Sequence, residues 1–358
     1  MDAKLTDSQG KPSRSFTPPG AQSPSFRPFN RVIVFSQQFS TMQVHRNLAD
    51  LPSFKHAVVT IGTFDGVHTG HQQIIEQMKS EARRIDGETV IITFHPHPRK
   101  IVNSASEIKL INTLEEKIEL LGERGIDHLV VVPFTESFSK LTAEEYIREF
   151  LVERFHPHTI IIGYDHRFGR ERKGDFHLME DFSPVFGYSL LEIPVHVLHA
   201  ISVSSTRIRE AISHADIAAA NELLGYDFFF EGTVIEGNKL GRTLGFPTAN
   251  LQIADKEKLV PGNGVYAVTV KLREEKTQLG GMMNIGIRPT LGGQLRVIEV
   301  NIFDFDRDIY GETLRVHVKK HLRPEQKFNG LDALKQQLAR DREEAIRSLP
   351  ETGWLRQE

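Results

Sequence analysis

Two histidines stand three positions apart in the stretch TIGTFDGVHTGHQQII, residues 60–75. A strand that only fills a core has no need of His68 or His71. Three glycines are interleaved with them: Gly62, Gly66 and Gly70. Backbone N–H groups and the dipole at a helix start favour an anion, and imidazoles can donate hydrogen bonds to phosphate oxygens. The stretch therefore predicts a strand-to-helix turn that binds the phosphates of a nucleotide.

The same residues allow other interpretations. The glycines could make only a tight turn, since glycine-rich turns between strands and helices are common. The histidines could be packed or solvated side chains. A metal pair is a further possibility, but no third ligand is evident nearby and the glycines favour close approach to phosphate.

Other polar segments suit a polyphosphate as well. HPHP (95–98) and GYDHRFGRERKGD (163–175) each follow a predicted strand, and the second is by default a solvated basic loop. ISVSSTRIREAI (201–212) places Ser204, Ser205 and Thr206 just before an amphipathic helical pattern, which predicts at least an N-cap. Capping does not explain Arg207 and Arg209 beside the same helix start. We expect these segments to converge on one edge of a sheet.

Apolar runs alternate with helical patterns from about residue 55. The strands are expected at 56–61, 89–94, 127–132 and 158–163, and the helices at about 69–86, 113–125 and 142–155. Parallel strands need long crossovers, so this alternation predicts a parallel sheet with helices on both faces. Ligands of such sheets bind beyond the carboxyl ends of the strands, where the unusual residues stand.

GTFDGVHTGH and SSTRIR resemble the HxGH and SSTxxR-type signatures of the nucleotidyltransferase superfamily. Together with GYDHRFGRERKGD they are similar to the adenylyltransferase domain of bacterial bifunctional riboflavin kinase/FAD synthetases, over about residues 43 to 225. The resemblance implies a Rossmann-like domain that transfers AMP from ATP to FMN with Mg²⁺ and releases pyrophosphate. His166 departs from the family pattern, where many relatives have Phe.

The resemblance also implies roles for residues of this chain. His68 and His71 would be catalytic by stabilising charge on the α-phosphate. The ATP-binding set would be Gly62, Phe64, Asp65, Gly66, Gly70, Ser204, Ser205, Thr206 and Arg207. The nucleotide and flavin pocket would include Asp165, Phe168 and Arg172.

The pattern changes near residue 226 to short β-branched strands joined by glycine-rich turns. These strands, at 227–235, 264–272, 281–287, 296–305 and 313–318, have no helices between them and predict a small antiparallel β-barrel. One long helix over about 330–349 follows. The chain is thus expected to have α/β and all-β parts, with domains at 42–225 and 226–358.

GRTLGFPTANL (241–251) is too rich in glycine and small polar residues for a strand, and PTAN alone predicts a turn. No GxxxxGK[ST] run occurs, which excludes a Walker-type kinase. Strand alternation places Glu299 on a partly apolar face. Its carboxylate could form an ion pair with Arg242 or Arg288, or could be a general base.

GFPTANL, GVYAV, NIGIRPT, EVNIFDFDRDIYG and HLRPEQKF resemble the riboflavin kinase module in order and spacing, over about residues 228 to 349. The resemblance implies a six-stranded barrel that phosphorylates riboflavin with ATP and Mg²⁺. Glu299 would be catalytic as the proton acceptor. Thr248 and Asn250 would bind ATP and the metal, Gly241 and Gly245 would also contact ATP, and Arg323 and Phe328 would lie near the flavin. Asn301 stands where many relatives have His.

Composition sets the remaining limits. The 358 residues carry 44 basic and 47 acidic side chains, a formal charge of −3, which gives no general attraction to nucleic acid or an anionic membrane. No cysteine is present, which fits a reducing, cytoplasmic location, and no apolar run of about 18 residues predicts a membrane span. Residues 1–41 are expected to be disordered, and Met42 could be the biological start.

The expected partners are small molecules: ATP, riboflavin and FMN, with no obligate protein partner. The FMN made by the barrel would be consumed by the sheet domain, with diffusion through solvent as the default route. The sequence leaves two alternatives, a nucleotidyltransferase for another acceptor and a non-enzymatic flavin-binding protein. The complete second module argues against the first, and the intact candidate catalytic residues argue against the second.

Overall fold

A computed structural model describes residues 42–102, 108–164, 166–237, 240–273, 275, 277–290, 293–350 and 354. The segment predicted to be disordered, 1–41, and the candidate pocket residue Asp165 lie outside the described residues. The first described element is a short strand directly after Met42.

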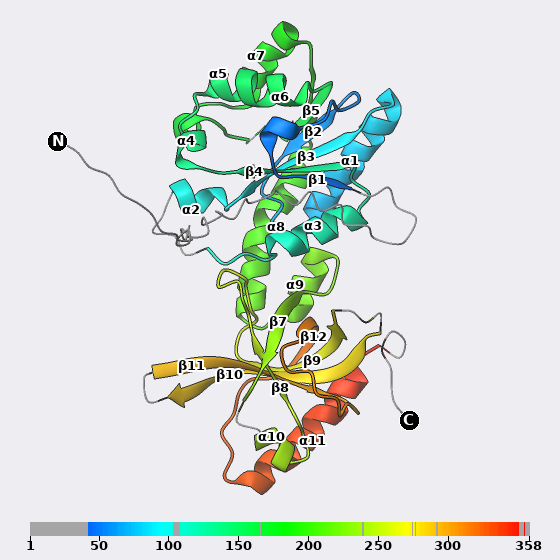
Figure 1. Cartoon of the computed structure of the whole chain (residues 1–358), viewed down its shortest axis with the longest axis vertical. Helices are drawn as coiled ribbons and strands as arrows, with labels where there is room; N and C mark the ends of the chain where they lie inside the picture. The colour runs from blue at the N-terminus through cyan, green and yellow to red at the C-terminus, as the bar shows by residue number, and fades with distance from the viewer. Residues whose placement is uncertain are drawn as a thin grey trace, which may run out of the picture. The chain divides into compact units, whose positions relative to one another are not determined.

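The first half of the described chain builds a parallel sheet of six strands in the order β1-β4-β3-β2-β5-β6 (Figure 1). The strands are β1 (Gln43–His45), β2 (Val58–Ile61), β3 (Thr89–His95), β4 (His128–Pro133), β5 (Thr159–Gly163) and β6 (Ser189–Ile193). All five neighbouring pairs are parallel. The four predicted strands are confirmed. The strands at the two edges, β1 and β6, were not predicted from the sequence.

Both faces of this sheet are covered, as predicted. Adjacent residues of β2 point to opposite faces, so Val58 belongs to one apolar cluster and Val59 to another. The cluster around Val58 also includes Ile75 of α1 (Thr69–Ile85) and Leu121 of α3 (Leu114–Glu123). The remaining helical segments before α8 are short or lie toward the second face: η1 (Leu48–Asp50), α2 (Pro98–Val102), α4 (Glu136–Ser139), α5 (Ala143–Glu145), η2 (Tyr146–Val152), α6 (Glu153–Phe155), η3 (Arg170–Arg172) and α7 (Phe176–Phe186).

Two helices follow the sheet and lead to the barrel. They are α8 (Val195–Ser213) and α9 (Ile217–Leu224). Ser204, Ser205 and Thr206 lie inside α8, so the predicted N-cap there is wrong; the helix begins nine residues earlier than Ser204, after Pro194. The segment before the serines contains Val195, Val197 and Ile201, which continue the helical pattern in place of a break.

The second half is a closed antiparallel barrel in the order β10-β11-β8-β7-β12-β9. Its strands are β7 (Phe229–Ile235), β8 (Ala249–Gln252), β9 (Gly264–Leu272), β10 (Leu279–Thr290), β11 (Gly293–Ile302) and β12 (Thr313–Arg323). The helices are α10 (Leu240–Thr243) and α11 (Leu331–Ser348). The predicted barrel and C-terminal helix are confirmed.

β8 corrects one prediction, because the end of GRTLGFPTANL is a strand. Ala249 and Asn250 pair with β11, and Asn250 and Leu251 pair with β7. Leu251 belongs to the apolar cluster of the barrel, and this burial outweighs the turn-like composition of the segment. The short strand closes the barrel between its two longer neighbours.

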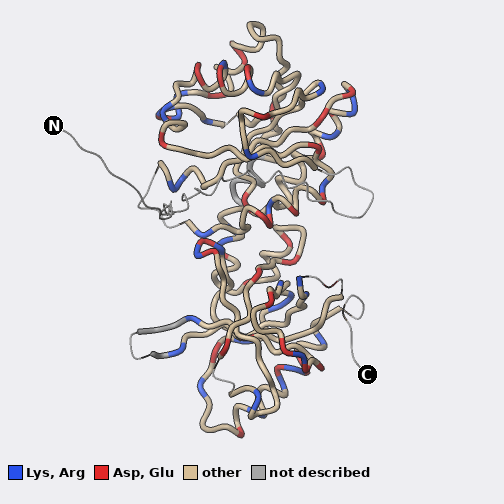
Figure 2. The backbone as a smooth tube through the Cα atoms, in the orientation of Figure 1, with Lys and Arg blue, Asp and Glu red and all other residues tan. Residues whose placement is uncertain are grey.

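Acidic and basic residues are interspersed along the described chain, as Figure 2 shows. No long stretch carries a single sign, in line with the small net charge of −3. Among the described residues, no helix is both long and apolar enough to span a membrane.

The core of the sheet gives a first testable prediction. Ile161 is fully buried at the centre of β5, so Ile161→Ala is expected to lower the free energy of unfolding by about 2–5 kcal/mol through lost contacts and a cavity. Urea unfolding followed by circular dichroism measures this. Val185→Ala, at a site on α7 that is 68% exposed, is the matched control and is expected to change stability by less than about 0.5 kcal/mol. Equal effects of the two substitutions would contradict this packing.

Candidate functional site

The turn between β2 and α1 has an unusual backbone. Phe64, Gly66 and Val67 all have positive φ angles, of 47°, 94° and 38°. Such angles strain residues with a side chain and are retained where the surroundings fix them. The side chains of Phe64 and Val67 are buried in the apolar cluster around α1, which supplies that constraint. The core of the domain therefore fixes the conformation of the candidate phosphate turn.

His68 and His71 lie at the start of α1, as the sequence predicted. His68 is the N-cap residue and makes no side-chain capping bond, while His71 lies one turn into the helix. Their rings stack at a centroid distance of 3.8 Å, and Phe64 packs on His71 at 4.8 Å. Both side chains are buried, and the Nδ1 atom of each has no hydrogen-bond partner among the described residues. The two imidazoles form one compact unit at the helix start.

Burial sets the protonation of this pair. It lowers the pKa of His68 to about 4, and the positive Arg209 adds to the effect while the Asp65 carboxylate opposes it. The pKa of His71 lies well below its usual value because of burial, with smaller contributions from His68 and Lys117. Both rings are therefore neutral at pH 7.

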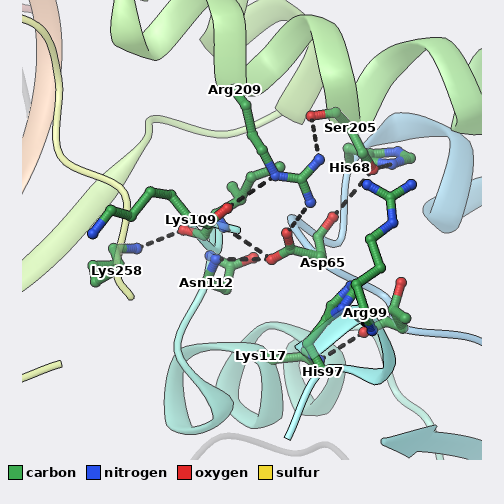
Figure 3. A network of polar contacts seen from close by, with 12 residues as sticks. Asp65, His68, His97, Arg99, Lys109, Asn112, Lys117, Ser205, Arg209 and Lys258 are labelled. Carbon is green, nitrogen blue, oxygen red and sulfur yellow. Dashed lines mark hydrogen bonds and ion pairs between the residues drawn. The ribbon is translucent and has the colours of Figure 1, made fainter. Parts of the chain in front are cut away.

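Asp65 anchors the turn through a network that Figure 3 shows. Its Oδ1 accepts hydrogen bonds from the backbone N–H groups of Ile111 (2.9 Å) and Asn112 (3.2 Å). Its Oδ2 accepts one from the Arg209 guanidinium at 2.5 Å. The carboxylate is buried and both its oxygens are occupied within the protein, so Asp65 holds the turn in place.

α8 brings the second predicted motif to this turn. The Ser205 hydroxyl lies 2.9 Å from His68 Nε2 and also donates to the Asp65 carbonyl at 3.5 Å. Thr206 and Arg207 are exposed. The side chain of Ser204 lies outside the described residues. The predicted convergence of GTFDGVHTGH with SSTRIR is thus present, through Ser205 and Arg209.

Sheet order places the other predicted loops beside the turn. β2, which leads into the turn, lies between β3 and β5, and all three strands are parallel. HPHP and the basic loop follow β3 and β5, so they leave the same sheet edge. In the basic loop, Phe168 stacks on Tyr146 at 4.8 Å inside an apolar cluster, while Arg172 is exposed. Among the described residues, no hydrogen bond or ion pair joins this loop to the histidine pair.

Lys117 of α3 belongs to the site but was missed by the sequence analysis. Its Nζ donates to the Thr63 carbonyl in the turn at 2.6 Å, and burial lowers its pKa to about 8. Leu114, Ile118 and Leu121 form the apolar stripe of the helix, at spacings where Lys117 shares their face. A lysine on the apolar face of a predicted helix was the sequence signal that could have identified Lys117 as a site residue.

The barrel contains a separate cavity of about 270 Å³. Its lining includes five predicted site residues: Gly241, Thr248, Glu299, Arg323 and Phe328. Arg288 and Asn284 of β10 also line it, and Asn284 is the ladder partner of Glu299 in β11. Residues as far apart in sequence as Leu240 and Leu338 thus line one cavity, which is bounded by α10, the segment before β8, strands β9, β10 and β11, the end of β12 and α11.

Glu299 accepts a hydrogen bond from Arg288 at 2.9 Å, which is one of the ion pairs that the sequence analysis considered. Asn250 is the partner of Glu299 in the β8–β11 ladder. Asn301 donates to the Pro247 carbonyl at 2.7 Å and so holds the segment that carries Thr248. A histidine at position 301 is therefore not needed to fix this segment.

Another part of the cavity wall comes from the end of β12 and the chain that follows it. Arg323 makes two bonds to Asp341 of α11, at 2.9 and 2.7 Å, and its guanidinium lies 5.7 Å from the Phe328 ring. On the α10 side, a side chain at Gly241 would meet the Phe246 carbonyl at 2.3 Å, so only glycine fits there. Gly245 has a φ of 85° and does not line the cavity.

Comparison with known proteins gives two families that match consecutive parts of the chain. The FAD synthetase family matches residues 51–207, and the riboflavin kinase family matches residues 224–349. The bifunctional riboflavin kinase/FMN adenylyltransferase of Escherichia coli K12 is 37% identical over 295 residues, which is 82% of this chain and 93% of that protein. The protein of the same name from Bacillus subtilis is 37% identical over 296 residues, covering 81% and 92%.

A solved structure is similar over most of its length. The crystal structure of a protein from Streptococcus pneumoniae named a macrolide-efflux protein matches with a TM-score of 0.76 and 31% identity. The match covers 86% of this chain and 99% of that one, so the order of a sheet domain and a barrel is shared.

The buried histidines give a pH prediction. Because the folded-state pKa of His68 lies near 4 and that of an unburied histidine near 6.5, the unfolded chain binds a proton at higher pH than the folded chain. The contribution of His68 to stability is therefore complete above pH 6.5 and is lost as pH falls toward 4. Titration by NMR is expected to show the His68 imidazole neutral from pH 8 to about 5, with the resonance assigned from its disappearance in His68→Asn. A His68 midpoint above pH 6 would contradict the buried, stacked geometry.

Proposed function

The chain belongs to the family of bifunctional riboflavin kinase/FMN adenylyltransferases, and from this premise we propose where each reaction takes place. The chain phosphorylates riboflavin to FMN and adenylylates FMN to FAD. We assign the adenylyl transfer to the sheet domain, residues 42–225, and the kinase reaction to the barrel domain, residues 226–358. The observation that carries this assignment is that the two sets of candidate residues gather separately, one around the β2–α1 turn and one around the barrel cavity.

In the sheet domain, an FMN phosphate oxygen attacks the α-phosphorus of ATP, the bond to the β-phosphate oxygen breaks, and pyrophosphate leaves. The residues of the chain position the phosphates and stabilise the charge that develops on them. Each neutral imidazole of the histidine pair can donate one hydrogen bond. The buried, unpartnered Nδ1 atoms of His68 and His71 support a bound group as their missing partner. The Lys117 ammonium adds positive charge beneath the turn.

The remaining residues of the motifs divide into two groups. Thr206 and Arg207 are exposed on α8, one and two positions after Ser205, and are proposed to hold the triphosphate together with Ser204 and Ser205. Gly62, Gly66 and Gly70 leave room for close approach of the phosphates. Phe64 and Asp65 shape the turn from within it. Asp165, Phe168 and Arg172 remain the candidates for the flavin and nucleotide pocket.

In the barrel, Glu299 is proposed to accept the proton of the ribityl hydroxyl as its oxygen attacks the γ-phosphorus of ATP. Arg288 orients the Glu299 carboxylate through their 2.9 Å bond. Arg323 is held by Asp341, and with Phe328 it forms a rigid wall suited to a flat flavin ring. Gly241 leaves the backbone open to the nucleotide, and Gly245 turns the chain before Thr248.

The residues around Glu299 fit a magnesium ion. Thr248 and Asn250 offer a hydroxyl and an amide oxygen, which are hard ligands, and Mg²⁺ in phosphoryl transfer usually has few protein ligands. Among the residues that the structure describes, no group of three or more His, Asp or Glu side chains forms a metal site. We propose that Thr248 and Asn250 hold Mg²⁺ together with the ATP phosphates. When bound, Mg²⁺ neutralises phosphate charge in both reactions.

A substitution in the barrel separates the two activities. Glu299→Gln keeps the size of the side chain but removes the proton acceptor, so FMN formation from riboflavin is expected to fall about a hundredfold or more. Conversion of added FMN to FAD is expected to stay within about twofold, because the sheet domain is unchanged. Flavin chromatography measures both. Glu312→Gln, at an exposed site of the same domain, is the control. Equal loss of both reactions would contradict separate sites.

A substitution in the sheet domain is expected to do the reverse. His71→Ala removes a hydrogen-bond donor to the α-phosphate, and FAD formation from FMN is expected to fall about a hundredfold. FMN formation from riboflavin remains as an internal measure of correct folding. His177→Ala, at a histidine whose side chain is 85% exposed, is the matched control. A His71→Ala protein that makes FAD at the normal rate would remove the histidine pair from the mechanism.

A further inference from the structure

A segment of the barrel domain reaches into the network that fixes Asp65. Residues 255–260 lie between β8 and β9, and Lys258 pairs with Leu110 in an isolated parallel bridge. The backbone bonds are Leu110 N–H to the Glu257 carbonyl and Leu259 N–H to the Leu110 carbonyl, both 2.8 Å. Leu110 directly precedes the two residues whose N–H groups bind Asp65.

The two peptide units that bind Asp65 are each held by this segment. The unit between Leu110 and Ile111 gives its N–H to Asp65 and receives the Leu259 N–H on its carbonyl. The next unit gives the Asn112 N–H to Asp65 and receives the Lys258 ammonium on the Ile111 carbonyl at 2.6 Å. Each peptide unit is therefore bonded through both its N–H and its carbonyl, and the donors to the two carbonyls come from the barrel domain.

Lys258 is itself tightly held. Its side chain is 1% exposed, and its Nζ donates to Glu116 Oε2 at 2.5 Å, where the Glu116 carboxylate also accepts the Thr113 N–H at the start of α3. Figure 3 shows Lys258 at one end of the network and His68 at the other, with Asp65 and Arg209 between them. The ammonium has no direct contact with the histidine pair among the described residues.

A second contact from the start of the barrel domain acts on the same turn. The Tyr226 hydroxyl donates to the Gly66 carbonyl at 2.6 Å, and it lies 3.3 Å from the Asn112 side-chain oxygen. Gly66 follows Asp65 and has the largest positive φ in the turn, 94°. Two elements outside the sheet domain thus hold the turn.

We propose that Lys258 is a positioning residue for FMN adenylylation, acting across the domains through the Ile111 peptide, Asp65 and Arg209 on His68 and Ser205. The kinase domain thereby completes the adenylyltransferase site, although it contributes no group to the reacting atoms. This inference rests on the proposed assignment of FMN adenylylation to the sheet domain.

The test uses the full-length protein with Lys258→Met, which fills the same space without donating a hydrogen bond. Without the Lys258 donor, the Ile111 peptide no longer holds Asp65 firmly, and the turn between β2 and α1 shifts. The kcat for conversion of FMN to FAD is therefore expected to fall about tenfold or more, while the KM for FMN changes less. The riboflavin kinase reaction on the same protein is expected to stay within about twofold. Lys256→Met is the matched control, since its side chain is exposed, and is expected to behave as wild type in both reactions.

Two further variants distinguish the proposed positioning role of Lys258 from a role of its buried ion pair in stability alone. Lys258→Met leaves the Glu116 carboxylate buried without its cation, which destabilises the fold. Glu116→Gln/Lys258→Met removes both charges but not the need for a donor to the Ile111 carbonyl, so adenylylation is expected to stay about tenfold low. Glu116→Gln alone keeps that donor and is expected to retain near-normal adenylylation. If Lys258→Met does not fold, the double variant decides.

The outcomes divide clearly. Wild-type adenylylation in a folded Lys258→Met protein, or its recovery in the double variant, would overturn the positioning role. Equal loss of kinase and adenylyltransferase activity in the double variant would overturn it as well. His71→Ala in the same assay tests the assignment of adenylylation to the sheet domain separately. If His71→Ala retains adenylylation, that assignment is wrong. If His71→Ala loses adenylylation while Lys258→Met retains it, only the positioning role of Lys258 is wrong.

Discussion

The arrangement of the sheet domain depends on the buried carboxylate of Asp65. It accepts two backbone N–H groups and the Arg209 guanidinium, in a turn whose backbone is held at three positive φ angles. A buried carboxylate is stable only when its oxygens are bonded, so the loop before α3, the turn after β2 and helix α8 must come together in one arrangement. The same arrangement places the Ser205 hydroxyl against His68. The position of the histidine pair thus follows from the hydrogen bonds and the ion pair that the buried Asp65 carboxylate requires.

The barrel domain holds its candidate site residues in a different way. Its cavity is framed by strands, and the groups that matter are held by short, local bonds: Arg288 on Glu299, Asn301 on the segment before Thr248, and Asp341 on Arg323. Closure of the barrel removes free sheet edges and fixes the register of β8 and β11, which sets Asn250 opposite Glu299. A rigid cavity of this kind suits phosphoryl transfer, where positioning supplies most of the catalysis.

The central strands, the barrel and the turn between β2 and α1 could be predicted because their signals are local in sequence. Continuous apolar runs specify buried parallel strands, whereas the edge strands β1 and β6 are only partly buried and contain no such run. The serines of α8 are compatible with a helix start and with a helix interior, and only the residues before them show that the helix has already begun. The partners of Asp65 stand 46, 47 and 144 positions away, so no spacing rule could find them. Lys258 was missed for the same reason.

Mixing two defective proteins tests the account of two separate sites joined by free FMN. Glu299→Gln should be unable to make FMN but able to adenylylate it, and His71→Ala should be unable to adenylylate FMN but able to make it. Each protein alone, given riboflavin, ATP and Mg²⁺, is predicted to make almost no FAD, and the mixture is predicted to make FAD as FMN passes between them through solvent. A mixture that accumulates FMN without FAD, or yields no flavin product, would contradict the account.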